Sequence, residues 1–155
     1  MAKDIKQATL CFLVQKGRIL LGMKKRGFGA GKWNGFGGKV NEDEKIEETA
    51  IRELQEECGI KTSSVEKMAE LTFLFPYKKE WNQTVHVFLV KEWEGEPLET
   101  EEMKPRWFRT DSLPFENMWQ DDPHWLPHIL KGKKVKARFV FGKDNESIDD
   151  MEIHI

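Results

Sequence analysis

The stretch GKVNEDEKIEETAIRELQEECGI, from Gly38 to Ile60, carries three carboxylates at helical spacing. On a helix Glu53 and Glu57 lie one turn apart, and Glu56 falls beside them. Because like charges on one stripe repel each other, a nearby cation is expected to offset the cost. Carboxylate oxygens are the ligands that Mg²⁺ and Mn²⁺ prefer. The stretch therefore predicts a metal site on a helix.

An apolar stripe borders these carboxylates. Ile46, Ala50 and Leu54 recur at i,i+4 spacing, which would place Glu57 at the edge of a core, where a carboxylate needs a partner. The alternative interpretation is a solvated helix face, which is what most charged runs form.

The predicted helix has a signal at each end. Asn41 with Glu44 three residues later is typical of a capping box, and Gly59 suits a left-handed helix end. A second helix is predicted over Pro123–Lys131, with Asp122 as its N-cap.

The rest of the chain alternates polar and apolar residues over short runs, which predicts strands and an α+β fold. We expect strands at Ala8–Gln15, Arg18–Met23, Lys67–Phe75, Thr84–Val90, Arg106–Phe108 and Val135–Phe141.

Length and composition indicate one globular domain over residues 1–155. The net charge of −2 offers no basic field for a nucleic-acid polymer, so we expect a small-molecule substrate and a monomer. Cys11 and Cys58 support neither a disulfide scaffold nor a zinc site, and they fit a reducing cytoplasm. The apolar run from Ala8 to Val14 is too short to span a membrane, and no signal peptide is recognised.

A glycine-rich stretch from Gly27 to Gly38 precedes the acidic helix. It lacks the Gly-Lys-Ser/Thr ending of a P-loop, so its value as a phosphate-binding motif is weak. Two interpretations remain, and both can hold. In the first, the stretch is a flexible loop whose glycines let the backbone pass close to the helix; in the second, it contacts phosphate as well.

The acidic segment resembles the Nudix box, which reads Gly, five residues, Glu, seven residues, Arg-Glu, an aliphatic residue, any residue, Glu-Glu, any residue, Gly and an aliphatic residue. Every fixed position is met, by Gly38, Glu44, Arg52, Glu53, Leu54, Glu56, Glu57, Gly59 and Ile60. The resemblance implies an α/β/α sandwich with a mixed central sheet.

The same resemblance implies hydrolysis of a phosphoanhydride by water with Mg²⁺, or Mn²⁺, as cofactor. Glu53, Glu56 and Glu57 would hold the metal, Glu102 from a distant loop would add a ligand, and Arg52 would orient a glutamate. The segment around Glu102 could instead be a solvated acidic loop.

The glycines before the helix would take part as well. By resemblance the backbone of Gly37 and Gly38 would lie near the metal and the phosphates, while Lys24 or Lys25 would neutralise negative charge.

Beyond the box, the chain is similar to the oxidised-purine nucleoside triphosphatases within this family. The matches are Leu20 to Gly31, Trp33 to Val40, Val85 to Phe88, Met118-Trp119 and Asp121-Asp122. They imply hydrolysis of 8-oxo-dGTP and 2-hydroxy-dATP to the monophosphate and pyrophosphate. By this resemblance the base is expected between Phe28, Phe73 and Trp119. Its edge would be recognised by Asn34, Asp121 and Asp122. Thr9 and Lys24 would lie nearer the sugar and phosphate.

Other interpretations remain for some of these residues. Trp119 and Trp125 at helical spacing are often core residues, and His86 on an apolar strand is more typical of structure than of metal binding. The sequence also departs from the relatives at Gln120 and over the loop from Pro76 to Trp81. A Nudix enzyme for dinucleoside polyphosphates would need the acidic helix but not the Asp121 pocket, and a binding module without activity would usually have lost a box carboxylate.

Overall fold

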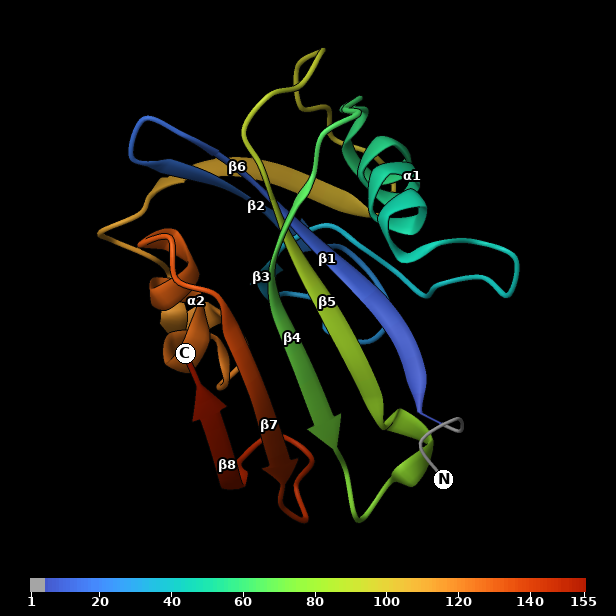
Figure 1. Ribbon diagram of the computed structural model, residues 1–155, viewed down its shortest axis with the longest axis vertical. Coiled ribbons are helices and arrows are strands. Elements are labelled where there is room, and N and C mark those ends of the chain that lie inside the picture. Colours follow the sequence, from blue (N-terminus) through green and yellow to red (C-terminus); the bar gives the residue numbers. More distant parts are fainter. Residues whose placement is uncertain (1–4) are drawn as a thin grey trace.

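The computed structural model describes residues 5–155, in which eight strands form one mixed sheet (Figure 1). The strand order is β3-β2-β1-β5-β4-β7-β8, and β6 pairs with β2. The strands are β1 (Lys6–Gln15), β2 (Arg18–Lys24), β3 (Trp33–Asn34), β4 (Glu66–Leu74), β5 (Gln83–Val90), β6 (Met103–Arg109), β7 (Val135–Phe141) and β8 (Ile148–His154). The helices are α1 (Ile46–Cys58) and α2 (Asp122–Leu130), with short 3-10 turns η2 (Lys79–Trp81) and η3 (Phe115–Asn117).

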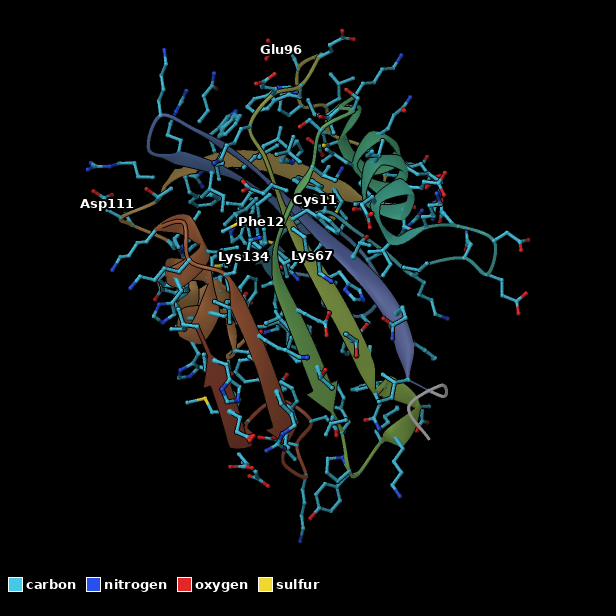
Figure 2. All side chains as sticks on the ribbon, viewed as in Figure 1. Cys11, Phe12, Lys67, Glu96, Asp111 and Lys134 are labelled. Carbon is cyan, nitrogen blue, oxygen red and sulfur yellow. The ribbon has the colours of Figure 1, made fainter. Side chains whose placement is uncertain are left out.

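The two helices cover opposite faces of the sheet, which gives the three layers α/β/α (Figure 1). Strand β1 shows why, because Cys11 and Leu13 pack toward α1 while Phe12 packs toward α2. A strand covered on both faces needs apolar residues at consecutive positions. Figure 2 shows Cys11 and Phe12 at the centre of the sheet and the charged Glu96 and Asp111 in loops at its periphery. The predicted fold class is confirmed.

The predicted strands are present, with ends that differ by at most three residues, and β7 has the predicted bounds. Two strands were missed. Strand β3 has only two residues and is defined by its pairing with Gly22 and Met23 rather than by any pattern of its own. Strand β8 is an edge strand that pairs with β7 and is mostly exposed, so its sequence carries no regular apolar alternation.

Both predicted N-caps were wrong. Helix α1 begins at Ile46, where the N–H of Lys45 donates to Glu48 at 2.8 Å. Glu44 Oε1 accepts from the N–H of Asn41 at 3.4 Å, but both residues lie in the loop before the N-cap Lys45, where Arg52 also donates to the Glu44 carboxylate. Helix α2 has Asp121, not Asp122, as N-cap, and neither carboxylate caps the helix. The predicted C-terminal glycine is confirmed, since Gly59 has a φ of 76° and its N–H donates to the carbonyl of Gln55.

Candidate active site

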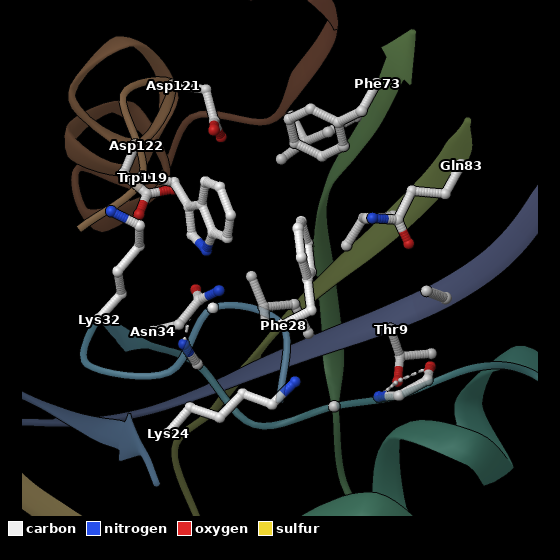
Figure 3. A pocket seen from close by; sticks show the side chains of 18 of the residues that line it. Thr9, Lys24, Phe28, Lys32, Asn34, Phe73, Gln83, Trp119, Asp121 and Asp122 are labelled. Carbon is white, nitrogen blue, oxygen red and sulfur yellow. Dashed lines mark hydrogen bonds between the residues drawn. The ribbon is translucent and has the colours of Figure 1, made fainter. Parts of the chain in front are cut away.

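A cavity of about 290 Å³ opens between the sheet, the loop after β2 and the segment that leads into α2 (Figure 3). Its wall includes all ten residues that the resemblance places at the substrate: Thr9, Lys24, Phe28, Asn34, Gly37, Gly38, Phe73, Trp119, Asp121 and Asp122. Glu57 also lines the cavity, so one continuous space joins the acidic helix to the aromatic residues. The volume is at the lower end of the range for small-molecule sites.

The segment from Phe36 to Lys39 runs antiparallel beside β1 and brings the backbone against α1. The N–H of Gly37 donates to Glu57 Oε1 at 2.8 Å. A Cβ on Gly37 would collide with the carbonyl oxygen of Thr9, and a Cβ on Gly38 would collide with the Glu53 carboxylate. Gly37 therefore needs glycine, because the atoms it would meet belong to the backbone of β1, whereas a side chain at Gly38 would displace the Glu53 carboxylate.

Burial leaves the carboxylates of α1 short of compensating charge. Burial raises the pKa of Glu57 to about 8. The hydrogen bond from the N–H of Gly37 lowers this pKa, and the nearby charges of Glu53 and Glu102 raise it. Burial also raises the pKa of Glu53, although the positive charge of Arg52 lowers it in part. Such a cluster of oxygen donors suits a hard divalent cation, which would stabilise the ionised carboxylates.

Glu56 lies at the exposed edge of this cluster. Arg52 donates to Glu44 at 2.7 Å and 3.0 Å and to Glu56 at 3.0 Å and 3.2 Å, which joins the loop before α1 to the last turns of the helix. These hydrogen bonds lower the pKa of Glu44 to about 2. Arg52 thus holds two glutamates, one in the loop before α1 and one on the helix, and its geometry is that of a positioning residue.

No three His, Cys, Asp or Glu side chains within residues 5–155 are gathered as ligands of a metal ion. The predicted triad is therefore only partly assembled, with Glu53 and Glu57 turned toward the glycines and Glu56 held by Arg52. Glu102 is exposed and lies near enough for its charge to raise the pKa of both Glu53 and Glu57. Glu53 and Glu57 fit a divalent cation best, and the part of Glu56 and Glu102 in binding it stays a prediction.

Binding of a divalent cation is expected to become tighter as the pH rises from 6 to 8. Glu57 holds a proton below its pKa of about 8, and a cation must displace that proton. The dissociation constant should therefore fall by up to about tenfold per pH unit over this range and then level off. Calorimetric titration with Mn²⁺ at several pH values measures it, and a dissociation constant independent of pH would contradict a role for Glu57.

Aromatic residues form the other end of the cavity. Phe28, which is 50% exposed, lies between Trp119 and Trp81 with ring centroids 5.1 Å and 4.6 Å away. Phe73 stacks on Phe139 behind it. The contact of Phe28 with Trp81 was not predicted, because Trp81 comes from a loop with no pattern that points to the cavity. Flat rings with open faces are typical of a site for a planar base.

Asp121 and Asp122 are buried beside these rings, at 4% and 3% exposure. Trp125 Nε1 donates to Asp121 Oδ2 at 2.8 Å, whereas Asp122 Oδ2 has no hydrogen-bond partner among the described residues. Burial raises the pKa of both carboxyl groups, and the charge of Asp121 raises that of Asp122 further. Both shifts favour a proton on the pair, and a pair that holds one proton can both donate and accept.

The structure also separates residues that the sequence could not. Trp125 is 1% exposed and belongs to the core, although it reaches the cavity wall, whereas Trp119 is a more open part of that wall. Of the two neighbouring lysines, Lys25 pairs with Glu99 and Lys24 lines the cavity. His86 is buried and its Nε2 lies 2.7 Å from Gln7 Oε1, which supports the structural interpretation.

The polar side chains predicted to recognise the substrate are partly engaged already. Asn34 Oδ1 accepts from the N–H of Gly35 at 2.8 Å, and the Asn34 NH₂ group has no hydrogen-bond partner among residues 5–155. The hydroxyl of Thr9 lies 3.4 Å from the carbonyl oxygen of Gly38, so Thr9 orders the glycine segment as well as lining the cavity.

Sequence reasoning missed three polar residues of the cavity wall, Lys32, Lys39 and Gln83. Lys32 lies with its Nζ 5.1 Å from the centre of the Trp119 ring, and Gln83 enters from the start of β5. Lys32 lies between the matched segments Leu20 to Gly31 and Trp33 to Val40, so its position in the sequence could have indicated a place near the substrate. Gln83 had no such signal, because the loop before it departs from the relatives.

Comparison with known proteins gives a consistent result. The NUDIX domain family matches residues 5–129. The oxidized purine nucleoside triphosphate hydrolase of Danio rerio is 48% identical over 95% of this chain and 96% of its own length, and that of Mus musculus is 47% identical over 90% and 88%. Among solved structures, a MutT protein from Bacillus halodurans superposes with a TM-score of 0.84 at 26% identity, covering 96% of this chain and 97% of that one. Within residues 5–155, no helix is long and apolar enough to cross a membrane.

Proposed function

Because this chain belongs to the Nudix family, we propose that it hydrolyses oxidised purine nucleoside triphosphates such as 8-oxo-dGTP and 2-hydroxy-dATP to the monophosphate and pyrophosphate. The observation that carries the proposal is the buried pair Asp121 and Asp122, which stands beside open aromatic faces in the same cavity as Glu57. A hydrolase of this kind would remove damaged precursors before they reach DNA.

The carboxyl pair accounts for the breadth of substrates. The two oxidised bases present different donors and acceptors along the edge of the six-membered ring. A pair that holds one proton offers both a donor and an acceptor, and the proton can move between the two groups. The NH₂ group of Asn34 adds a donor from the other side of the loop. Phe28, Phe73 and Trp119 would hold the plane of the base.

At the phosphate end, Glu53 and Glu57 would hold a divalent cation, Mg²⁺ or Mn²⁺, with Glu56 and Glu102 as further oxygen donors. The cation would withdraw charge from the phosphates and make a water molecule more acidic. Gly37 and Gly38 let the phosphates approach the backbone, and Lys24 supplies positive charge. Arg52 holds Glu56 and Glu44 in place, so it positions the helix and does not touch the substrate.

Turnover of 8-oxo-dGTP, 2-hydroxy-dATP, dGTP and dATP, measured in parallel with Mg²⁺, tests the proposal. We expect a higher kcat/KM for the two oxidised nucleotides and release of pyrophosphate. Water labelled with ¹⁸O would show which phosphorus is attacked. Activity on none of the four, together with activity on a dinucleoside polyphosphate, would keep the Nudix chemistry and overturn the substrate.

The protonated pair gives a pH prediction. Because burial and the charge of Asp121 raise the pKa of Asp122, the pair donates only below that pKa, and kcat/KM for 8-oxo-dGTP should fall on the alkaline side. Asp122→Asn keeps a donor at every pH, so its profile should lack this alkaline fall. Asp111→Asn, in an exposed turn, is the matched control. An unchanged profile for Asp122→Asn would contradict a proton on the pair.

We further infer that residues 1–155 form one domain, since β7 and β8 join the same sheet as the strands inside the matched region. The two buried free thiols, Cys11 and Cys58, support a reducing compartment such as the cytoplasm. We also propose that the protein is a monomer. Sedimentation in the presence of a reductant tests the monomer.

A further inference from the structure

Gln83 differs from its neighbours on the cavity side of the sheet. It begins β5, pairs across to Phe73 on β4, and shares its face with Leu71 and Val85, which are apolar. Within residues 5–155 its side-chain amide has no hydrogen-bond partner in the protein, although the side chain is partly buried. A free amide in an apolar wall has hydrogen-bonding capacity that a ligand can use.

The amide lies on the side of the cavity opposite Asp121 and Asp122 (Figure 3). A purine has polar atoms on two opposite edges, one on its six-membered ring and one on its five-membered ring. A base whose six-membered ring meets the carboxyl pair therefore turns its five-membered ring toward Gln83. This step rests on the proposed function, because it takes the base to be a purine bound at Asp121 and Asp122.

Oxidation at C8 changes that second edge. In guanine N7 is an acceptor and C8 carries only hydrogen, whereas in 8-oxoguanine N7 carries a hydrogen and C8 a carbonyl oxygen. The edge thus presents a donor next to an acceptor, and a side-chain amide offers the complementary acceptor and donor in one group. We propose that Gln83 is a specificity-determining residue that recognises the N7–C8 edge of an 8-oxopurine.

Gln83→Met tests this proposal, because it keeps the length of the side chain and removes both hydrogen-bonding groups. Loss of the contact is expected to lower kcat/KM for 8-oxo-dGTP by about tenfold, as for one or two neutral hydrogen bonds. The values for dGTP and for 2-hydroxy-dATP should change by less than about twofold, because neither base has the oxidised C8 edge. Gln83→Glu keeps an acceptor for N7–H but places a negative charge near the C8 oxygen. It should therefore also lose the preference for 8-oxo-dGTP over dGTP.

Gln15→Met, at the exposed end of β1, is the matched control, and thermal unfolding of each variant checks the fold. Binding of 8-oxo-dGMP by calorimetry gives a second readout, in which Gln83→Met should bind the product about tenfold more weakly. Equal losses on 8-oxo-dGTP and 2-hydroxy-dATP, or no loss on either, would overturn the assignment of Gln83 alone. A wild-type protein that does not prefer 8-oxo-dGTP to dGTP would overturn the proposed function and this assignment with it.

Discussion

Glu57→Gln is expected to lower kcat by more than about a hundredfold with Mg²⁺ present, since changes to outer-shell groups of a metal site alone cost about 10–100-fold. Glu57 is the most deeply buried of the three carboxylates on α1, and it receives the N–H of Gly37 at 2.8 Å. A glutamine keeps the oxygen that accepts this hydrogen bond but cannot become an anion. The variant should therefore fold and bind the cation weakly.

Stability separates this effect from misfolding. Because burial raises the pKa of Glu57 to about 8, the free protein carries an uncharged side chain there at neutral pH. That uncharged form contributes its full stability only below the ordinary pKa of about 4.5, and the contribution is lost progressively as the pH rises to about 8. The midpoint of thermal unfolding without metal should thus change little in Glu57→Gln at pH 4, and the variant should become increasingly the more stable protein as the pH rises to 8.

The matched control is Glu47→Gln, an exposed carboxylate on the first turn of the same helix. It should keep wild-type kcat and the wild-type response of the unfolding midpoint to Mn²⁺. Turnover by Glu57→Gln near the wild-type rate would remove Glu57 from the metal site and leave Glu53 with the exposed glutamates as the candidates.

Gly37→Ala is expected to cost both activity and stability. Its Cβ would collide with the carbonyl oxygen of Thr9 and come within 3.0 Å of the Cα of Leu10. These are backbone atoms of β1, so the segment must move away and the N–H that reaches Glu57 moves with it. A shift of about 1 Å at a catalytic group costs about a hundredfold in rate. Overpacking of this kind costs about 1–3 kcal/mol of unfolding free energy.

Urea unfolding and kcat with 8-oxo-dGTP measure the two effects of Gly37→Ala. Gly142→Ala is the control, because a Cβ there meets only the carboxylate of Asp149, which can turn aside. Wild-type kcat in Gly37→Ala would show that the close approach of this segment to α1 is not needed for the reaction.

The sequence by itself determined the elements that depend on local spacing. The period of helix α1, its apolar stripe and its glycine end are properties of neighbouring residues, and so are the strands whose apolar residues lie under α1 and α2. The acidic helix and the glycines before it could therefore be predicted, as could the residues that the family resemblance assigned to the cavity.

Other features were decided only by the tertiary structure. Arg52 holds the Glu44 carboxylate, and Glu99 pairs with Lys25. Trp81 reaches Phe28 from a loop far along the chain, and Gln83 lines the same cavity as Asp121 and Asp122 from another element. Each contact joins residues far apart in sequence, and several residues of similar chemistry could have made it. Which residue makes it depends on how whole elements pack against the sheet, because charge and hydrogen-bonding capacity act over only a few ångströms.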